Sequence, residues 1–201
     1  MILALILACR PDPGAPTYAD RAPDARDTAS GFLTDPLDEG ELRLGIGAFY
    51  EGPTTASVPI DDTTTHFYVY ENSFGVEVSD DRVEGYASDT IVLRGNSWWG
   101  GGVHWDVPQD LTAYDTLHVA LKTDALTDWY VGLKGGAEGR VAVSAAGLTP
   151  DGEWHTLDLP LSSFTGVDLG AVTVGLLLVG DGGASGDSVS IDDVYFRGSS
   201  R

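Results

Sequence analysis

From residue 41 onward the chain is dominated by short stretches in which apolar and polar residues alternate. Leu117, Val119 and Leu121, for example, are separated by His118 and Ala120. The same period of two recurs around residues 42–46, 67–70, 76–78, 91–94, 103–107, 129–134, 141–143, 157–161, 172–179 and 191–196. Period two is typical of strands with one buried face, and Gly, Asp, Asn and Pro separate the stretches as turns would. We therefore predict one all-β domain over residues 41–198, a sandwich or a barrel.

The first forty residues differ sharply from this pattern. Residues 1–8 are apolar and stand directly before Cys9, the only cysteine of the chain. The segment 6–9 (ILAC) resembles the lipobox of a bacterial lipoprotein signal, which implies cleavage after residue 8 and a lipid on Cys9. The run is short and has no Lys or Arg before it, which a start codon placed too late would explain. A buried N-terminal strand with an inert cysteine is the alternative interpretation.

Residues 9–40 read as a linker between this anchor and the domain. Five of the ten prolines of the chain lie between residues 10 and 39, among many Asp and Ala. Such a segment buries too little apolar surface to offset the entropy of ordering it, so we expect it to be disordered.

The net charge of the chain limits the classes of partner that it can bind. It carries 31 acidic and 11 basic residues, a formal net charge of −20. Phosphates of a nucleic acid and anionic lipid headgroups would both be repelled. Since no other apolar stretch approaches the length of a membrane span, we expect contact with a membrane only through the lipid. These features predict an exported protein of the bacterial cell envelope, anchored at the outer membrane or the cell surface.

Three segments in the second half resemble galactose-binding-like jelly rolls. Residues 110–117 (DLTAYDTL) follow a Trp- and Gly-rich turn at 98–103 (WWGGGV), as in that family, and lead into a strand. Residues 152–164 (GEWHTLDLPLSSF) and the closing 189–196 (VSIDDVYF) resemble its later strands. Carbohydrate-binding modules and the domain appended to some bacterial glucan exohydrolases share these segments in this order. The resemblance implies a two-sheet antiparallel jelly-roll sandwich.

The resemblance also implies a structural calcium ion between the first and last strands. Its ligands would be Glu51, in the segment 49–52 (FYEG), and Asp193, in the closing pair of aspartates. Calcium takes six to eight oxygen ligands, mixing carboxylates with backbone carbonyls, and so suits this pair in a glycine-rich setting. The alternative is that both residues are solvated strand ends.

Candidate sugar-binding residues are aromatic rings and nearby polar groups on one sheet face. Trp98 and Trp99 sit on the glycine-rich turn, where one ring could face solvent. If the polar positions of the strands lie in one sheet, they bring together Arg94, His104, Asp106, His118, Lys122, Tyr130 and Lys134. Trp105, Trp129 and Trp154 alternate with apolar residues, and we expect them in the core.

No catalytic motif accompanies these candidates. The sequence contains no His-Glu-x-x-His, Gly-x-Ser-x-Gly, phosphate loop or dinucleotide fingerprint. We therefore expect a non-enzyme. The first hypothesis is an envelope lipoprotein that binds a polysaccharide or oligosaccharide. The alternative is a structural or protein-interaction lipoprotein without a glycan ligand, which a large apolar surface patch would favour.

Overall fold

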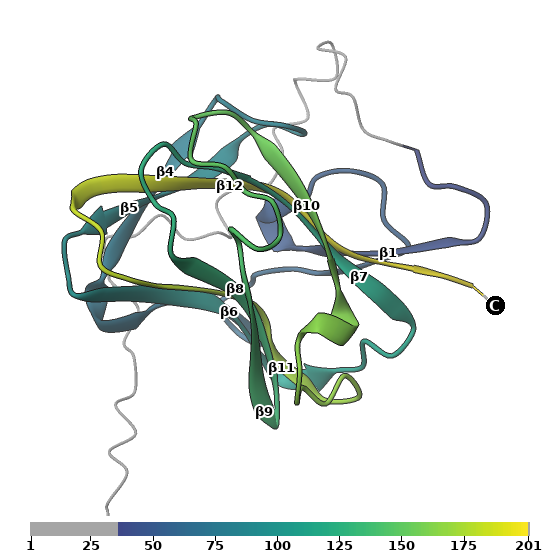
Figure 1. The fold of residues 1–201 in the computed structure, drawn as a ribbon. Coiled ribbons are helices and arrows are strands. Elements are labelled where there is room, and N and C mark those ends of the chain that lie inside the picture. The colour runs from purple at the N-terminus through teal and green to yellow at the C-terminus, as the bar shows by residue number, and fades with distance from the viewer. Residues whose placement is uncertain (1–35, 201) are drawn as a thin grey trace, which may run out of the picture.

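The computed structural model describes residues 36–200, which fold into two sheets stacked face to face (Figure 1). The seven-stranded sheet contains β1 (Glu41–Ile46), β2 (Ala56–Val58), β4 (Phe74–Ser79), β5 (Ser88–Arg94), β7 (Tyr114–Lys122), β10 (His155–Pro160) and β12 (Ser185–Ser199). The five-stranded sheet contains β3 (Thr65–Val69), β6 (Trp98–Gln109), β8 (Trp129–Gly135), β9 (Ala137–Ala142) and β11 (Val172–Asp181). Three short 3-10 helices, η2 (Gly47–Phe49), η3 (Tyr70–Asn72) and η4 (Leu161–Ser163), connect strands.

The all-β prediction is confirmed, and the strand order is that of a sandwich. The five-stranded sheet has the order β3-β6-β11-β8-β9, with every neighbouring pair antiparallel. The other sheet has the order β10-β7-β12-β1-β2, and β5 joins β12 to β4. Only the short β2 departs from the antiparallel pattern, since it pairs with β1 in parallel. The predicted signal segment, Cys9 and most of the predicted linker lie outside the described residues.

The core fills the space between the two sheets and follows the alternation of the sequence. Odd-numbered positions of β7, such as Leu117 and Leu121, are fully buried, as are Val131 and Leu133 of β8. Trp105 and Trp129 lie in this core, as predicted. Gly175 makes room for Trp105, because a Cβ atom there would lie 2.1 Å from the ring.

Trp154 was predicted to lie in the core, and this prediction was wrong. Since Leu157 and Leu159 of β10 point inward, the even-numbered positions face outward. Trp154 is half-buried on that outer side, and its Nε1 donates to Asp81 Oδ1 at 3.0 Å. Pro160 ends β10, which forms one edge of its sheet, a position where proline is tolerated. No helix within residues 36–200 has the length and apolar character needed to span a membrane.

Candidate functional site

The outer face of the five-stranded sheet brings together aromatic and charged side chains from all five strands and η3. We call it the five-stranded face; its side chains are Tyr68, Tyr70, Trp98, His104, Asp106, Tyr130, Lys134, Arg140, Val174, Leu177, Val179 and Asp181. The register of β11 places them in rows across the sheet. Val179 lies between Gly100 of β6 and Tyr130 of β8, and Asp181 lies opposite Trp98. Trp98 and Tyr130 therefore stand on either side of β11, one row apart.

A pocket of about 210 Å³ opens between these two aromatic residues. Its lining consists of Trp98, Tyr130, Arg140, Val179, Gly180 and Asp181. Trp98 is half-buried and Tyr130 is 36% exposed, so both rings can offer surface to a ligand. A guanidinium and a carboxylate in the same lining supply hydrogen-bond donors and acceptors. Aromatic walls with a few polar groups are typical of small-molecule sites.

Tyr70 forms the wall beside this pocket by lying across a glycine of β6. A Cβ atom at Gly100 would lie 2.9 Å from the Trp98 ring, 2.9 Å from Val179 and 3.0 Å from the Tyr70 ring. The three side chains thus converge over a position where only glycine leaves space. Consequently Tyr70 supports the Trp98 ring from the side and limits how far it can turn.

The η3 turn that carries Tyr70 is held in an unfavourable backbone conformation. Glu71 and Asn72 have φ angles of 51° and 54°, in the left-handed region that costs a non-glycine residue about 1–2 kcal/mol. Ser73 fastens the turn to β6, because Gly100 N donates to Ser73 Oγ at 3.1 Å. Strain of this kind persists only where surrounding contacts impose it.

His104 links Tyr70 to the rest of the face. Its Nε2 lies 2.6 Å from the Tyr70 hydroxyl oxygen, and its ring meets Tyr68 edge-on with centroids 5.0 Å apart. Burial lowers the pKa of His104, and the charges of Lys134 and His66 act in the same direction. A neutral His104 can accept the hydrogen bond of the Tyr70 hydroxyl at Nε2.

Two cations flank the other side of the face. Arg140 of β9 donates from Nε to Glu138 Oε1. Lys134 of β8 is exposed and has no hydrogen-bond or ion-pair partner within residues 36–200. Lys134 and His104 lie on either side of Val174 of β11. The face therefore has aromatic groups along β3 and β6 and positive charge along β8 and β9.

Comparisons with known proteins identify the architecture. No protein-family model and no curated protein matches the sequence. Among solved structures, the chain is similar to the family 30 carbohydrate-binding module of a cellulosomal cellulase of Clostridium thermocellum, with 13% identity, a TM-score of 0.54 and coverage of 78% of this chain and 96% of that chain. It is also similar to the family 11 carbohydrate-binding module from Clostridium thermocellum in complex with a β-1,3-1,4-mixed-linked tetrasaccharide, with 16% identity, a TM-score of 0.53 and coverage of 80% and 96%.

The fold is a two-sheet jelly-roll sandwich, as in these two carbohydrate-binding modules. Identities this low establish a shared fold and leave the ligand to be argued from the site itself. The jelly roll places five of the predicted sugar-binding residues on the five-stranded face: Trp98, His104, Asp106, Tyr130 and Lys134. Asp106 lies at the β3 side of that face, where Oδ2 is 3.5 Å from His66 Nε2.

The other four predicted residues of the set lie elsewhere in the jelly roll. Trp99 is only 2% exposed and packs in the core against Phe74 and Trp129. Its position follows from the alternation of β6, which points Trp98 outward and its neighbour inward. Arg94 belongs to β5 in the seven-stranded sheet, as His118 and Lys122 of β7 do. The assumption that these polar positions share one sheet was wrong, because the strands alternate between two layers.

Four residues of the five-stranded face were missed in the sequence: Tyr68, Tyr70, Arg140 and Asp181. Arg140 could have been predicted from the sequence, because Val141 points inward and its neighbours on the strand must point outward. Tyr70 was not, because its position depends on the left-handed turn at Glu71 and on space above Gly100. Neither feature leaves a periodic signal.

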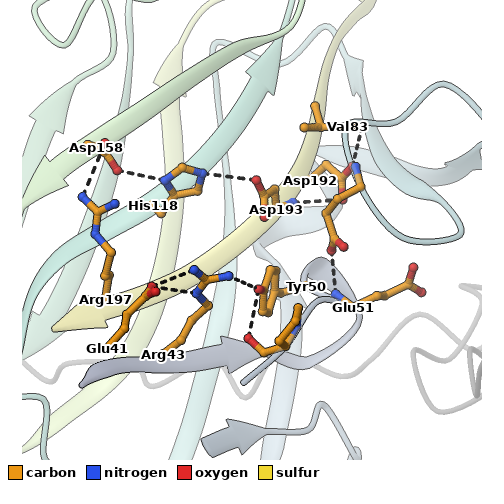
Figure 2. Close-up of polar contacts among 12 residues, drawn as sticks. Glu41, Arg43, Tyr50, Glu51, Val83, His118, Asp158, Asp192, Asp193 and Arg197 are labelled. Carbon is orange, nitrogen blue, oxygen red and sulfur yellow. Dashed lines mark hydrogen bonds and ion pairs between the residues drawn. The ribbon is translucent and has the colours of Figure 1, made fainter. Parts of the chain in front are cut away.

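The outer face of the seven-stranded sheet carries a separate polar network, which Figure 2 shows. Arg43 of β1 is 4% exposed, its guanidinium carbon lies 4.6 Å from the centre of the Tyr195 ring, and it donates to the Tyr50 hydroxyl at 2.6 Å and to Glu41 at 2.7 Å. The His118 ring stacks on Tyr195 with centroids 4.4 Å apart. Because these charged groups are paired and largely buried, we interpret this network as a structural part of the fold and not as a ligand site.

The two predicted calcium ligands do not face one another in this network. Asp193 has a φ of 53°, and its Oδ2 lies 3.2 Å from His118 Nε2. Glu51 turns the other way: its carboxylate accepts a hydrogen bond from Tyr86 N (Figure 2 shows both side chains). Residues 36–200 contain no group of three His, Cys, Asp or Glu side chains placed to hold a metal ion.

Glu84, which was not among the predicted site residues, has a buried carboxylate beside Glu51. It is 6% exposed; Oε1 accepts from Glu51 N at 2.6 Å, while Oε2 has no hydrogen-bond partner. Burial raises the pKa of Glu84 to about 8, and the carboxylates of Asp192, Asp193 and Glu51 act in the same direction. A buried carboxylate oxygen without a donor is costly unless a proton or a cation satisfies it.

Proposed function

We propose that this jelly roll is a non-catalytic polysaccharide-binding domain that holds its glycan on the five-stranded face. The observation that carries the proposal is the pocket between Trp98 and Tyr130, with Arg140 and Asp181 in its lining. The apolar C–H faces of sugar rings pack on aromatic rings, and charged side chains form hydrogen bonds with sugar hydroxyls. The pocket supplies both kinds of group within neighbouring rows of the sheet.

The length of the five-stranded face fits an oligosaccharide better than a single sugar. Trp98 and His104 are six residues apart on β6, a distance of about 20 Å at the rise of a strand. Tyr70 and Tyr68 line that length on the β3 side. The family 11 module to which the chain is similar was solved with a tetrasaccharide, and a ligand of such length would span the rows from the pocket to His104.

Large apolar residues on the surface do not favour the protein-interaction alternative. Those exposed within residues 36–200 are Val78, Val83, Val107 and Tyr130, which belong to β4, the loop 80–87, β6 and β8. Such residues are scattered singly, as on most soluble domains, so they do not argue for a docking patch.

Calorimetric titration of the domain against soluble β-glucans and galactans tests the proposal. We expect measurable affinity for at least one polysaccharide, and its loss in Trp98→Ala and Tyr130→Ala. Arg94→Ala is the matched control, since Arg94 lies on the other sheet, and it should bind as the wild type does. Absence of binding across a broad glycan array would refute the function.

We also propose that the protein is exported and anchored to a bacterial envelope by a lipid on Cys9, with the linker spanning the gap to the polysaccharide. The support is the ILAC segment and the proline-rich stretch that follows it. Metabolic labelling with a fatty-acid analogue tests this. The wild type should be labelled and Cys9→Ser should not; an unlabelled wild-type protein would overturn the anchor.

A structural calcium ion is a further part of the proposal, with Glu84 as its principal ligand in place of the expected pair Glu51 and Asp193. The partnerless, buried Oε2 of Glu84 supports it, because carboxylate oxygens are the ligands that calcium prefers. When bound, the ion would neutralise the charge gathered where the loop 80–87 meets Glu51.

A further inference from the structure

The cations of this acidic domain are almost all engaged with its own groups. Between residues 36 and 200 there are seven Lys and Arg side chains. Arg43, Lys122, Arg140 and Arg197 pair with carboxylates, and Arg82 donates to backbone carbonyls. Only the side chains of Lys134 and Arg94 have no such partner within the described residues. In a domain with so many carboxylates, an unpaired Lys134 on the five-stranded face calls for a physical explanation.

Glu138 is the nearest carboxylate in register with Lys134, yet it is engaged elsewhere. The two residues are directly opposite on β8 and β9. Glu138 instead accepts from Arg140 Nε, two residues along its own strand. The lysine ammonium is therefore left exposed on the five-stranded face. Arg140 uses only Nε in this pair, and a guanidinium has five N–H donors in all.

Lys134 and Arg140 are close enough to act on one ligand. Arg140 lies opposite Gly132, so it is the diagonal neighbour of Lys134 across the two strands. Diagonal neighbours in an antiparallel pair are about 7–8 Å apart. Leu177 of β11 covers Gly132 beside them, because a Cβ atom at Gly132 would lie 3.0 Å from the Leu177 side chain. Arg140 also lines the pocket, which connects this pair of cations to the aromatic walls.

We infer that the glycan bound on the five-stranded face is acidic, with a uronate carboxylate held by Lys134 and Arg140. The inference rests on the proposed function and names its substrate class. Charge-assisted hydrogen bonds to a carboxylate are about twice as strong as those to a hydroxyl, and a guanidinium matches the geometry of a carboxylate. A neutral sugar would leave the Lys134 charge without a counterpart when the ligand displaces water.

The net charge of the domain does not oppose this binding at physiological salt. Exposed charges more than about 8 Å apart are largely screened at 0.15 M ionic strength. Carboxylates beyond that distance therefore weigh less on a bound uronate than Lys134 and Arg140, and the nearby Glu138 is already paired with Arg140. Asp181, at the far end of the pocket from Lys134, is left to accept hydrogen bonds from sugar hydroxyls.

The test compares one oligosaccharide in two chemical forms. The probes are a homogeneous oligouronate and the same chain with its carboxyl groups reduced to primary alcohols, both titrated calorimetrically against the full domain. We expect the wild type to prefer the oligouronate by at least about tenfold. Lys134→Gln should lose that preference and keep its affinity for the reduced chain. Lys134→Arg should restore most of it.

The matched control is Arg94→Gln, which removes the other unpaired cation from the opposite sheet and should leave both affinities unchanged. A sulfated neutral oligosaccharide forms a third arm, and preference for it over the oligouronate would overturn the assignment of a carboxylate. Binding of the reduced chain as tightly as the oligouronate would overturn the inference and leave the proposed function standing. If none of the three chains binds, the inference fails, and binding to another polysaccharide in the broad glycan array would still leave the proposed function standing.

Discussion

Trp98 and Trp99 are neighbours in the sequence and lie on opposite faces of the same sheet. The first lines the pocket on the outer face, and the second packs between Phe74 and Trp129 in the core. A single step along β6 thus separates a ring available to a ligand from a ring that holds the two sheets together. The same substitution at the two positions should therefore have opposite consequences.

Trp98→Ala should weaken glycan binding by at least about tenfold, because the pocket loses an aromatic wall. Its free energy of unfolding should change little. Trp99→Ala should instead destabilise the domain by about 3–5 kcal/mol, the usual cost of removing a buried aromatic ring. Chemical denaturation and calorimetric titration measure the two effects. Equal loss of stability in both variants would contradict the separation of roles.

Gly175→Ala should destabilise the domain by about 1–3 kcal/mol, as overpacking of a core does. A methyl group there would lie 2.1 Å from the Trp105 ring, which is buried and cannot move aside freely. Gly75→Ala is the matched control: it is also in a strand, and its Cβ would meet nothing closer than 4.0 Å. Thermal melts should show a lower midpoint for the first variant alone.

Period-two alternation was sufficient to predict the strands, but it could not assign them to sheets. The polar positions of β7 and β8 look alike in the sequence, yet His118 and Lys134 face opposite sides of the sandwich. Which sheet a strand joins depends on pairing between segments far apart in the chain, such as β12 with β5. One sequence carries no direct record of that pairing.

The pocket was only half predictable for a related reason. Trp98 and Tyr130 lie on strands, where alternation fixes which way a side chain points. Tyr70 lies on a turn whose shape depends on two left-handed residues and on the bond of Ser73 to β6. Trp154 shows the opposite error: it was assigned to the core because it alternates with apolar residues, yet Leu157 and Leu159 of β10 point inward and Trp154 lies on the outer side.

Stability should fall as the pH is lowered below about 6.5, in part because of His104. The pKa of His104 is lowered in the folded state, since it is buried and faces Lys134 of β8 and His66 of β3, with only Asp106 opposing. Tyr70 of η3 contacts it without a charge. As the pH falls, His104 therefore binds a proton in the unfolded chain before it does so in the folded domain. The stability present above the pKa of the unfolded state is lost as the pH falls through the pKa of the folded state.

Denaturation curves at pH 7.5 and pH 5.5 measure this effect. His104→Gln keeps a polar side chain beside Tyr70 and removes the titration, so its loss of stability between the two pH values should be smaller than that of the wild type. An identical loss in both proteins would show that other groups account for the acid sensitivity.

Chelation of calcium should lower the melting temperature of the wild-type domain, because an ion bound only by the folded state stabilises it by mass action. Glu84→Gln removes the charge of the partnerless buried carboxylate, so its melting temperature should be the same with and without chelator. Asp193→Asn is the discriminating control: Asp193 Oδ2 faces His118, so this variant should keep its response to chelator. The reverse pattern, with the response lost in Asp193→Asn and kept in Glu84→Gln, would restore the ligand expected from the sequence and reject Glu84.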